Sequence, residues 1–541
     1  MLTRKQRWIL GISIALAVFF VATYIAGSLL LKRVEPTVRE QAIRYLRERF
    51  HADVQIAAIH IHLPRISTMG LVFRKQRGAI VSVDAEKIVL SQPQRANTPL
   101  FTINQLSFSV DLASILGTKK KVEAVWIDGL QITLPPKQQG RPAASSGSGT
   151  KKKPLNVELQ DVEIRNATLV ILPRDPTRQP FNYAITRLHL TPIGAGQPMN
   201  YDADLNIPKP PGHVLSKGRF GPWNADEPGD TPLNGTYHFE NADLGIFNGI
   251  AGILHSTGQF SGTLASLEAK GQADVADFRL NISGNRVPLH TEFEALIDGT
   301  NGNVELHPVH ARLGTTDFTT EGVIVKHDFD PRRTISLKVQ MPDGNLPDLL
   351  RLAMKGSPFM SGRVNFQAKI DIPPLASKVK QKIILDGTFN VRDGKFLHST
   401  IQSQIDNLSR HAQGQPQNQE IDSVASGLRG AFHLENQLMT FRSLAFGVPG
   451  AAVALAGTYN LRDDQLDFHG SLRLVAKVSQ MVTGWKSMAL KLIDPLFEKE
   501  GAGTFLHIVV EGDSRHPRFG VEFLGKTKSL KVTAPAPAMK H

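Results

Sequence analysis

Strict alternation of apolar and polar residues recurs along most of the chain after about residue 50. The longest run is Val364-Asn-Phe366-Gln-Ala368-Lys-Ile370-Asp-Ile372, and residues 106–112, 335–339 and 466–474 repeat the pattern. A period of two places all apolar side chains on one face of a sheet. Strands buried on both faces would instead contain continuous apolar runs. The pattern therefore predicts a mainly β fold, a long twisted antiparallel sheet with one dry face and one wet face.

Residues that tolerate positive φ separate these segments and predict tight hairpin turns. They are Asp128-Gly129, Asp298-Gly299, Asn301-Gly302, Asp393-Gly394 and Asp463-Asp464. A short unit (small, aromatic, polar, apolar, charged, turn pair, apolar) recurs at residues 235–244, 387–396, 430–439 and 457–466. We interpret each copy as the end of one strand, a turn and the start of the next strand. The irregular spacing between copies excludes a fixed-period solenoid.

Helical periodicity interrupts the alternation at a few places. Residues 34–50, 345–354 and 399–412 are predicted to be helical, and the strongest pattern covers residues 478–497. The last of these is an amphipathic helix whose apolar side includes Val478, Met481, Val482, Trp485, Met488, Leu492 and Phe497. Two interpretations stay open: a helix that caps the dry face of the sheet, or a helix that faces a membrane or gates the sheet.

The segment from Trp8 to Leu31 contains no charged residue. As a helix it would be ~36 Å long, enough to cross a hydrocarbon core of ~30 Å. It is longer than the apolar region of a cleavable signal peptide. We predict an uncleaved signal anchor at residues 1–33, with Arg4, Lys5 and Arg7 before the span and Lys32 and Arg33 after it.

Composition narrows the classes of function. The 541 residues contain 62 Lys+Arg, 49 Asp+Glu and no cysteine. Disulfides, thiolate metal sites and a cysteine nucleophile are therefore excluded. The net charge of +13 favours acidic partners, and with only 7% aromatic residues and no nucleic-acid motif we expect membrane phospholipid rather than nucleic acid.

No catalytic motif is present, so we expect neither an enzyme nor a cofactor. The pairs His60/His62 and His307/His310 lack a third metal ligand nearby and are more simply surface histidines, so no metal site is predicted. Asp371 and Asp467 alternate with apolar neighbours, as expected of a solvated sheet face. The runs Lys119-Lys-Lys121 and Lys151-Lys-Lys153 are interpreted as solubilising loops that can also contact anionic lipid headgroups.

Several segments together resemble the AsmA-like family of bacterial envelope proteins, which includes TamB and its relatives. They are Val54-Gln-Ile56-Ala-Ala-Ile59, WIDGLQITLP at 126–135, DGTNGNVEL at 298–306, QIDNLSRHAQG at 404–414 and VEGDSRHPRF at 510–519. The resemblance covers most of the chain and is strongest in its C-terminal half. It implies an inner-membrane anchor, a periplasmic body, and a β-groove similar to that of bridge-like lipid transfer proteins. Counted alone, the basic residues after the span would keep the body inside. The absence of cysteine and the resemblance favour a periplasmic body.

The sequence patterns and the resemblance together predict seven regions. They are the anchor at 1–33, a juxtamembrane helix at 34–50, a β region at 51–136, a flexible basic linker at 137–154, a central β-groove at 155–344, an AsmA-like C-terminal region at 345–525 and a disordered tail at 526–541.

The expected function is to bind or conduct phospholipid along an open hydrophobic groove toward the outer membrane, with other envelope proteins as further partners. The candidate lining residues are Phe108, Val110, Phe366, Ile370, Phe389, Val391, Leu461, Phe468, Leu472 and Leu474. Three alternatives stay open. The first is structural: a closed β-sandwich would show the same alternation. The second is a structural or chaperone-like factor in outer-membrane protein assembly. The third is an enzyme that acts on cell-wall glycans.

Overall fold

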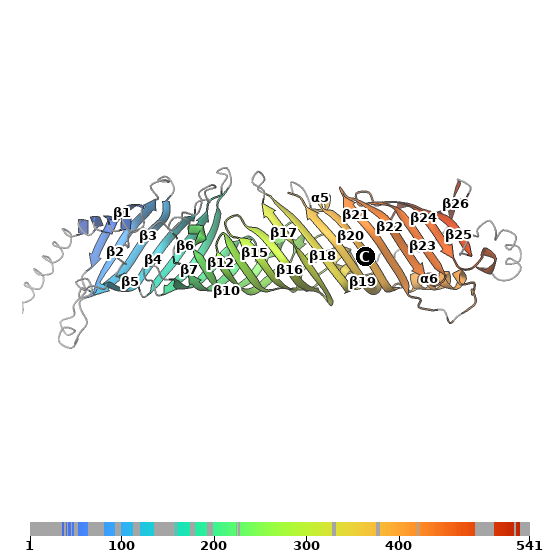
Figure 1. Ribbon diagram of the computed structural model, residues 1–541, viewed down its shortest axis with the longest axis horizontal. Helices are drawn as coiled ribbons and strands as arrows, with labels where there is room; N and C mark the ends of the chain where they lie inside the picture. Colours follow the sequence, from blue (N-terminus) through green and yellow to red (C-terminus); the bar gives the residue numbers. More distant parts are fainter. Residues whose placement is uncertain are drawn as a thin grey trace, which may run out of the picture. The chain divides into compact units, whose positions relative to one another are not determined.

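The alternating segments form strands of a large, mainly antiparallel sheet in the computed structural model (Figure 1). Twenty-five strands are assigned to this sheet, and β11 (Ile250–Ala251) and β14 (Arg279–Leu280) form a two-stranded one. The predicted mainly β class with few helices is confirmed. The structure describes residues 35–36, 39–40, 42–44, 46–47, 52–62, 80–91, 99–111, 120–134, 157–159, 161–173, 179–191, 198–222, 224, 228–326, 332–374, 379–418, 420, 422–481, 503–514, 516–523 and 526–530.

The chain divides into two compact units, and the first comprises residues 1–208, 212–238 and 259–267. Its strands are β1 (Asp53–His62), β2 (Ile80–Ser91), β3 (Pro99–Asp111), β4 (Lys120–Leu134), β5 (Val157–Leu159), β6 (Val162–Ile171), β7 (Phe181–Thr191), β8 (Met199–Pro208) and most of β9 (Pro211–Phe220). Successive strands pair antiparallel from β1 to β4 and from β6 to β8. β4 instead pairs parallel with β5 and β6, so the predicted antiparallel pairing is wrong at this point. A parallel pair needs a crossover connection, and the segment available for it contains the predicted linker at 137–154, which lies outside the described residues.

The second unit comprises residues 209–211, 239–258 and 268–541. Its antiparallel ladder follows the chain through β15 (Leu289–Asp298), β16 (Asn303–Leu313), β17 (Thr316–Lys326), β18 (Arg333–Asn345), β19 (Met360–Ile372), β20 (Ile384–Phe396), β21 (Ser426–Glu435), β22 (Leu438–Val448), β23 (Ala451–Asn460), β24 (Gln465–Leu474), β25 (Thr504–Asp513), β26 (Arg518–Phe523) and β27 (Lys526–Leu530). β10 (Pro232–Asp243), β12 (Ile253–Thr263) and β13 (Ser266–Val275) contain positions at which the division between the units falls.

Helices lie at opposite ends of the strands in the second unit. α4 (Leu346–Ala353) follows β18, and α6 (Ser399–Ala412) follows β20, as predicted from their periodicity. The strand ends that carry them are called the helix margin. α5 (Val379–Lys382) and the turns after β21 and β23 lie at the opposite ends, called the turn margin (Figure 1). The remaining short helices are η2 (Pro228–Asp230), η3 (Leu244–Ile246) and η4 (Val478–Met481).

Some of the predicted turns connect two strands, and others lie inside a single strand. The pairs at 298–302 and at 463–464 connect β15 to β16 and β23 to β24, as predicted. Asp128-Gly129 and Asp393-Gly394 instead lie inside β4 and β20, so the hairpins predicted there are wrong. The positive φ angles, 67° at Gly129 and 54° at Asp393, are accommodated within the strands. At Asp393 the register shifts between Val391 and Gly394, which is the signature of a β-bulge.

The copies of the repeated unit also differ: two form hairpins and two lie within single strands. The copies at 430–439 and 457–466 form hairpins between β21 and β22 and between β23 and β24. The copies at 235–244 and 387–396 lie within β10 and β20, apart from Leu244, which begins η3, so the hairpin interpretation is wrong for both.

The predicted N-terminal and late helices fall partly or wholly on residues that the structure does not describe. The described positions between 35 and 47 are helical, and Ala42, Ile43 and Leu46 pack on the buried cluster of β1 and β2. Within 478–497, only η4 is described. The predicted anchor from Trp8 to Leu31 lies outside the described residues. Of the predicted disordered tail at 526–541, only residues 526–530 are described, and they form the strand β27. Among the helices that are described, none is both long enough and apolar enough to cross a bilayer.

Candidate functional site

One side of the sheet in the second unit is apolar from β19 to β25, and we call it the apolar face. Alternation in β19 points Val364, Phe366, Ala368 and Ile370 to this side. The ladders then place apolar residues or glycines opposite them on each following strand. The row from Val364 continues through Val391, Leu428, Phe446, Val453, Leu472 and Leu506, and the row from Ala368 through Gly387, Phe432, Phe441, Gly457, Phe468 and Val510.

Five phenylalanines, Phe366, Phe389, Phe432, Phe441 and Phe468, form an aromatic band along the middle of this face. The ring centroid of Phe432 lies 6.3 Å from those of Phe366, Phe389 and Phe441. The centroids of Phe441 and Phe468 are 5.7 Å apart. These separations lie in the range of favourable aromatic pairs.

Glycines opposite the rings provide the space that the band occupies. A Cβ atom at Gly387 would lie 2.6 Å from Cζ of Phe432, and one at Gly430 would lie 2.8 Å from Cζ of Phe389. The rings therefore lie over backbone rather than beside side chains.

The apolar face is buried beside the two helices and mostly half-buried elsewhere, with Ala368, Leu434 and Phe468 as buried exceptions. Val364 and Val391 are 1% and 3% exposed. Phe366, Phe389 and Phe432 are only half-buried, although Phe468 is buried. A second sheet packed at ~10 Å would cover the middle of the face at least as well as its margin. Among the described strands, only the short pair β11 and β14 lies outside the large sheet.

The two helices account for the burial at the helix margin. Leu346 of α4, with Leu349 and Leu350, packs on a buried cluster formed by Met341, Met360, Val364 and Val391. Ala412 of α6, with Ile405 and Leu408, packs on Val424, Val448, Ala451 and Leu474.

Buried carboxylates fix both helices in place. Asp348 of α4 accepts hydrogen bonds from the backbone N–H of Thr315 at 2.8 Å and from the Thr316 hydroxyl at 3.1 Å. Asp406 of α6 accepts one from the backbone N–H of Val424 at 2.8 Å.

A segment that we call the strap, residues 244–252 and 276–288, contacts helices from both margins. A Cβ atom at Gly249 would lie 3.4 Å from Cγ2 of Val379 in α5. The amide of Asn285 donates to the carbonyl oxygens of Arg351, Met354 and Gly356, at and after the end of α4, at 3.1, 2.8 and 3.1 Å. The backbone N–H of Asn281 donates to the carbonyl of Gly249 at 2.9 Å and joins the two halves of the strap.

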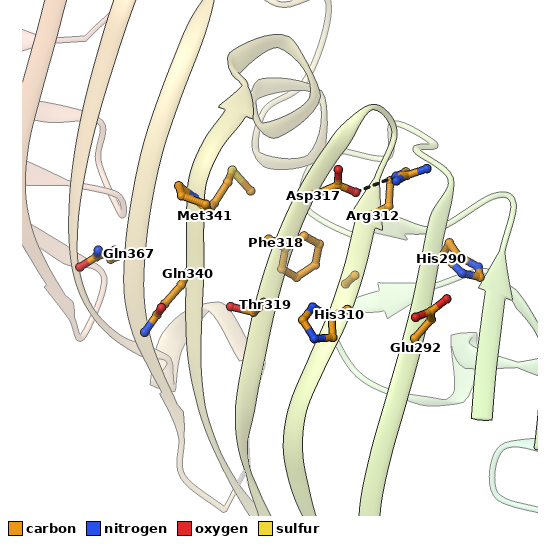
Figure 2. A pocket seen from close by; sticks show the side chains of 12 residues that line it. His290, Glu292, His310, Arg312, Asp317, Phe318, Thr319, Gln340, Met341 and Gln367 are labelled. Carbon is orange, nitrogen blue, oxygen red and sulfur yellow. Dashed lines mark hydrogen bonds and ion pairs between the residues drawn. The ribbon is translucent and has the colours of Figure 1, made fainter. Parts of the chain in front are cut away.

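The opposite side of the sheet is polar and rich in ion pairs. Lys369 lies 2.8 Å from Asp371, and hydrogen bonds from Lys369 and Ser336 lower the pKa of that carboxyl group. A hydrogen bond to Asp386 raises the pKa of His433. A hollow of about 450 Å³ on this side is bordered by His290, His310 and the Arg312–Asp317 pair among others. Figure 2 shows the side chains that line it.

Histidines pair with single carboxylates in both units. His62 lies 3.0 Å from Asp84, and His307 lies 3.7 Å from Glu294. Neither of the histidine pairs considered in the sequence belongs to a metal-ligand group among the described residues. Asp467 and His469 form such a group with Glu511, which the sequence did not connect to them because it lies on the next strand. All three side chains are exposed.

Most of the predicted lining residues share the apolar face. They are Phe366, Ile370, Phe389, Val391, Phe468, Leu472 and Leu474. Leu461 instead lies in the turn after β23 and is 39% exposed. Phe108 belongs to the first unit, where it packs on a cluster that includes Val125 and Val162. The side chain of Val110 lies outside the described residues.

The predicted amphipathic helix is described only at its start. Met481 packs on the cluster at α6, and Val478 belongs to η4. Val482, Trp485, Met488, Leu492 and Phe497 lie outside the described residues.

Phe432 and Phe441, the centre of the aromatic band, are absent from the predicted lining residues. Phe432 stands in the alternating run Leu428-Arg-Gly-Ala-Phe432-His-Leu434, so the period-two pattern could have identified it. Phe441 is harder to find, because β22 has a register shift between Phe441 and Leu444 that changes the alternation.

Comparisons of the chain with protein-family models, with curated proteins and with solved structures gave no match.

Proposed function

We propose that the protein binds phospholipid acyl chains on the apolar face and conducts them along the sheet. In this proposal it is an AsmA-like envelope protein, anchored in the inner membrane by Trp8–Leu31, with its body in the periplasm and its cargo moving toward the outer membrane. The observation that carries the proposal is the aromatic band, in which every ring except Phe468 is only half-buried and for which no opposing sheet exists among the described residues.

Exposing acyl chains to water has a large free-energy cost, and an apolar protein surface lowers that cost. A diacyl lipid with ~30 methylenes exposes apolar surface that costs ~24 kcal/mol in water, at ~0.8 kcal/mol for each CH₂. An apolar surface that the chains can cover removes most of this barrier, while the headgroup stays hydrated. No catalytic group takes part in this process.

The contacts of the strap support the proposal that the apolar face is curved into a groove. α4 precedes β19 and α5 follows it, so the two helices lie at opposite ends of a strand that is ~40 Å long at ~3.3 Å per residue. Asn281, bonded to Gly249, and Asn285 are separated by a stretch that can span at most ~14 Å. Contacts to both helices from so short a segment favour a sheet whose two margins approach each other over the apolar face.

The proposal is tested by comparing two adjacent positions on β20 that point to opposite faces. Phe389 belongs to the aromatic band, and Thr388 is exposed on the polar side. The full chain is purified in mild detergent and bound phospholipid is quantified by mass spectrometry. We expect Phe389→Asp to reduce bound lipid at least fivefold, because a carboxylate opposes acyl contact, and Thr388→Asp to leave it unchanged.

Circular dichroism shows whether each variant is folded, and Phe389→Ala provides a milder change if Phe389→Asp does not fold. An absence of phospholipid from the unsubstituted protein, or equal lipid in both folded variants, would overturn the proposal. Bound polypeptide in place of lipid would favour the chaperone-like alternative.

A further inference from the structure

The turn margin carries a hollow of about 440 Å³ lined by Gln381, Lys382, Asn436, Gln437 and Arg462, and we call it the basic margin. Three connections contribute to it: α5 before β20, the turn between β21 and β22, and the turn between β23 and β24. These strands also carry most of the aromatic band. The hollow therefore lies at the ends of the strands whose middle is apolar and half-buried.

The backbone of the basic margin is fixed by local geometry and hydrogen bonds. Asn436 and Gln437 have φ angles of 50° and 67°, as a two-residue hairpin turn of type I′ requires. The backbone N–H of Leu461 donates to the carbonyl of Gln437 at 2.8 Å and joins the two turns. The side chain of Asn460 accepts from the backbone N–H of Arg462 at 3.0 Å.

The hollow is cationic, because its lining contains Lys382 and Arg462 and no carboxylate. The acidic side chains on the adjoining residues have other partners. Glu435 lies 3.5 Å from His433, and Asp464 accepts a hydrogen bond from the Tyr459 hydroxyl at 3.0 Å. Asp463 accepts from the backbone N–H of Gln465 at 3.4 Å.

Apolar side chains continue from the basic margin to the aromatic band. Leu461, in the turn after β23, lies beside the hollow and is 39% exposed, whereas Leu438 is 42% exposed on the polar side, in register with Asn460. The row nearest this margin on the apolar face consists of Ile370, Leu385, Leu434, Met439, Tyr459 and Leu466. The next row contains Phe432, Phe441 and Phe468. Lys382 lies three residues before Leu385 and Arg462 three residues after Tyr459, so the cationic groups adjoin an apolar surface. This arrangement matches the two ends of an anionic amphiphile.

We propose that the basic margin binds the anionic phosphate headgroup of a lipid whose acyl chains lie on the apolar face. The proposal rests on the proposed function and adds to it a side of entry and a charge preference. The helix margin is covered by α4 and α6, so the headgroup lies at the turn margin. Lys382 and Arg462 contact the phosphate, and the amide side chains of Gln381 and Gln437 donate to its oxygens.

The test measures binding of two fluorescent lipids with identical chains, one phosphatidylglycerol and one phosphatidylcholine, to the full chain in neutral detergent. The variant is Lys382→Gln/Arg462→Gln. Its control is Lys355→Gln/Lys395→Gln, which removes the same charge from exposed positions near the helix margin. We expect the first variant to lose about three- to tenfold in affinity for phosphatidylglycerol, on the scale of other Lys and Arg contacts with anionic headgroups. Affinity for phosphatidylcholine and all values for the control should stay within twofold.

Three outcomes would overturn the headgroup assignment. One is an equal loss in both variants, which would indicate net charge alone. Another is no change in the preference for phosphatidylglycerol. The last is competition by millimolar inorganic phosphate without any effect of the acyl chains, which would indicate a free-phosphate site. If the unsubstituted protein binds neither lipid, the proposed function fails; if it binds both and the preference is insensitive to Lys382 and Arg462, only the headgroup assignment fails.

Discussion

At the scale of single residues, the apolar face depends on the pairing of phenylalanines with glycines. Gly387 and Gly430 lie opposite the rings of the aromatic band, and a Cβ atom at either position would overlap a ring. In most strands a glycine is a weak point, because it has no side chain to pack. Here the missing side chain leaves room for the rings of the aromatic band.

Gly387→Ala tests this arrangement. We expect a loss of about 1–3 kcal/mol in the free energy of unfolding, because the new methyl group overpacks against Phe432 and the Gln367 carbonyl. Gly427→Ala is the matched control, since a Cβ atom there meets its nearest neighbours at 3.9 and 4.0 Å. It should be neutral or stabilising by up to ~1 kcal/mol. Urea unfolding followed by tryptophan fluorescence and circular dichroism measures both, and equal stability of the two variants would contradict the pairing.

At the scale of elements, the sequence predicted strands and helices well and turns less well. The alternation at 364–372 and 466–474 falls in β19 and β24, and the periodicity at 345–354 and 399–412 corresponds to α4 and α6. The same turn residues, however, produce a hairpin at Asp463-Asp464 and a bulge at Asp393-Gly394. Both local conformations need positive φ, so only the pairing with the next strand distinguishes them. Gly394 is paired with Ser426, and β20 continues past the bulge.

The strap is the element that sequence reasoning missed. Its strands, β11 and β14, are two residues each, too short for a periodic signal. Asn285 holds it to the end of α4 by three hydrogen bonds to carbonyl oxygens. Such a side chain is indistinguishable in the sequence from any other loop asparagine.

Asn285→Ala tests how strongly the strap is held. Removing the amide leaves the carbonyls of Arg351, Met354 and Gly356 without this donor, so we expect a loss of about 1–2 kcal/mol. Hydrogen–deuterium exchange should rise in residues 279–285 and in α4. The half-buried Asn418, whose side chain forms local hydrogen bonds with Gln415 and with the backbone N–H of Glu420, supplies the control Asn418→Ala. Unchanged exchange in α4 would show that the strap does not depend on this contact.

At the scale of the whole molecule, the β class and its two-faced character follow from alternation alone. Alternation does not distinguish an open face from a closed sandwich, because both bury one side of each strand. The half-buried rings of Phe366, Phe389 and Phe432, with no opposing sheet among the described residues, are the observation that favours the open face. Their exposure depends on what covers each row, which is a property of α4 and α6 rather than of the strand itself.

The most direct measurement of the central claim is site-specific photocrosslinking in bacterial membranes. A benzophenone amino acid is placed in the full chain at Leu455, on the apolar face, or at the adjacent Ala454, which is exposed on the polar side. Crosslinked products are identified by mass spectrometry. We predict phospholipid adducts from position 455 and none above background from position 454. Adducts only to polypeptide at 455, or equal lipid adducts at both positions, would contradict an acyl-binding apolar face.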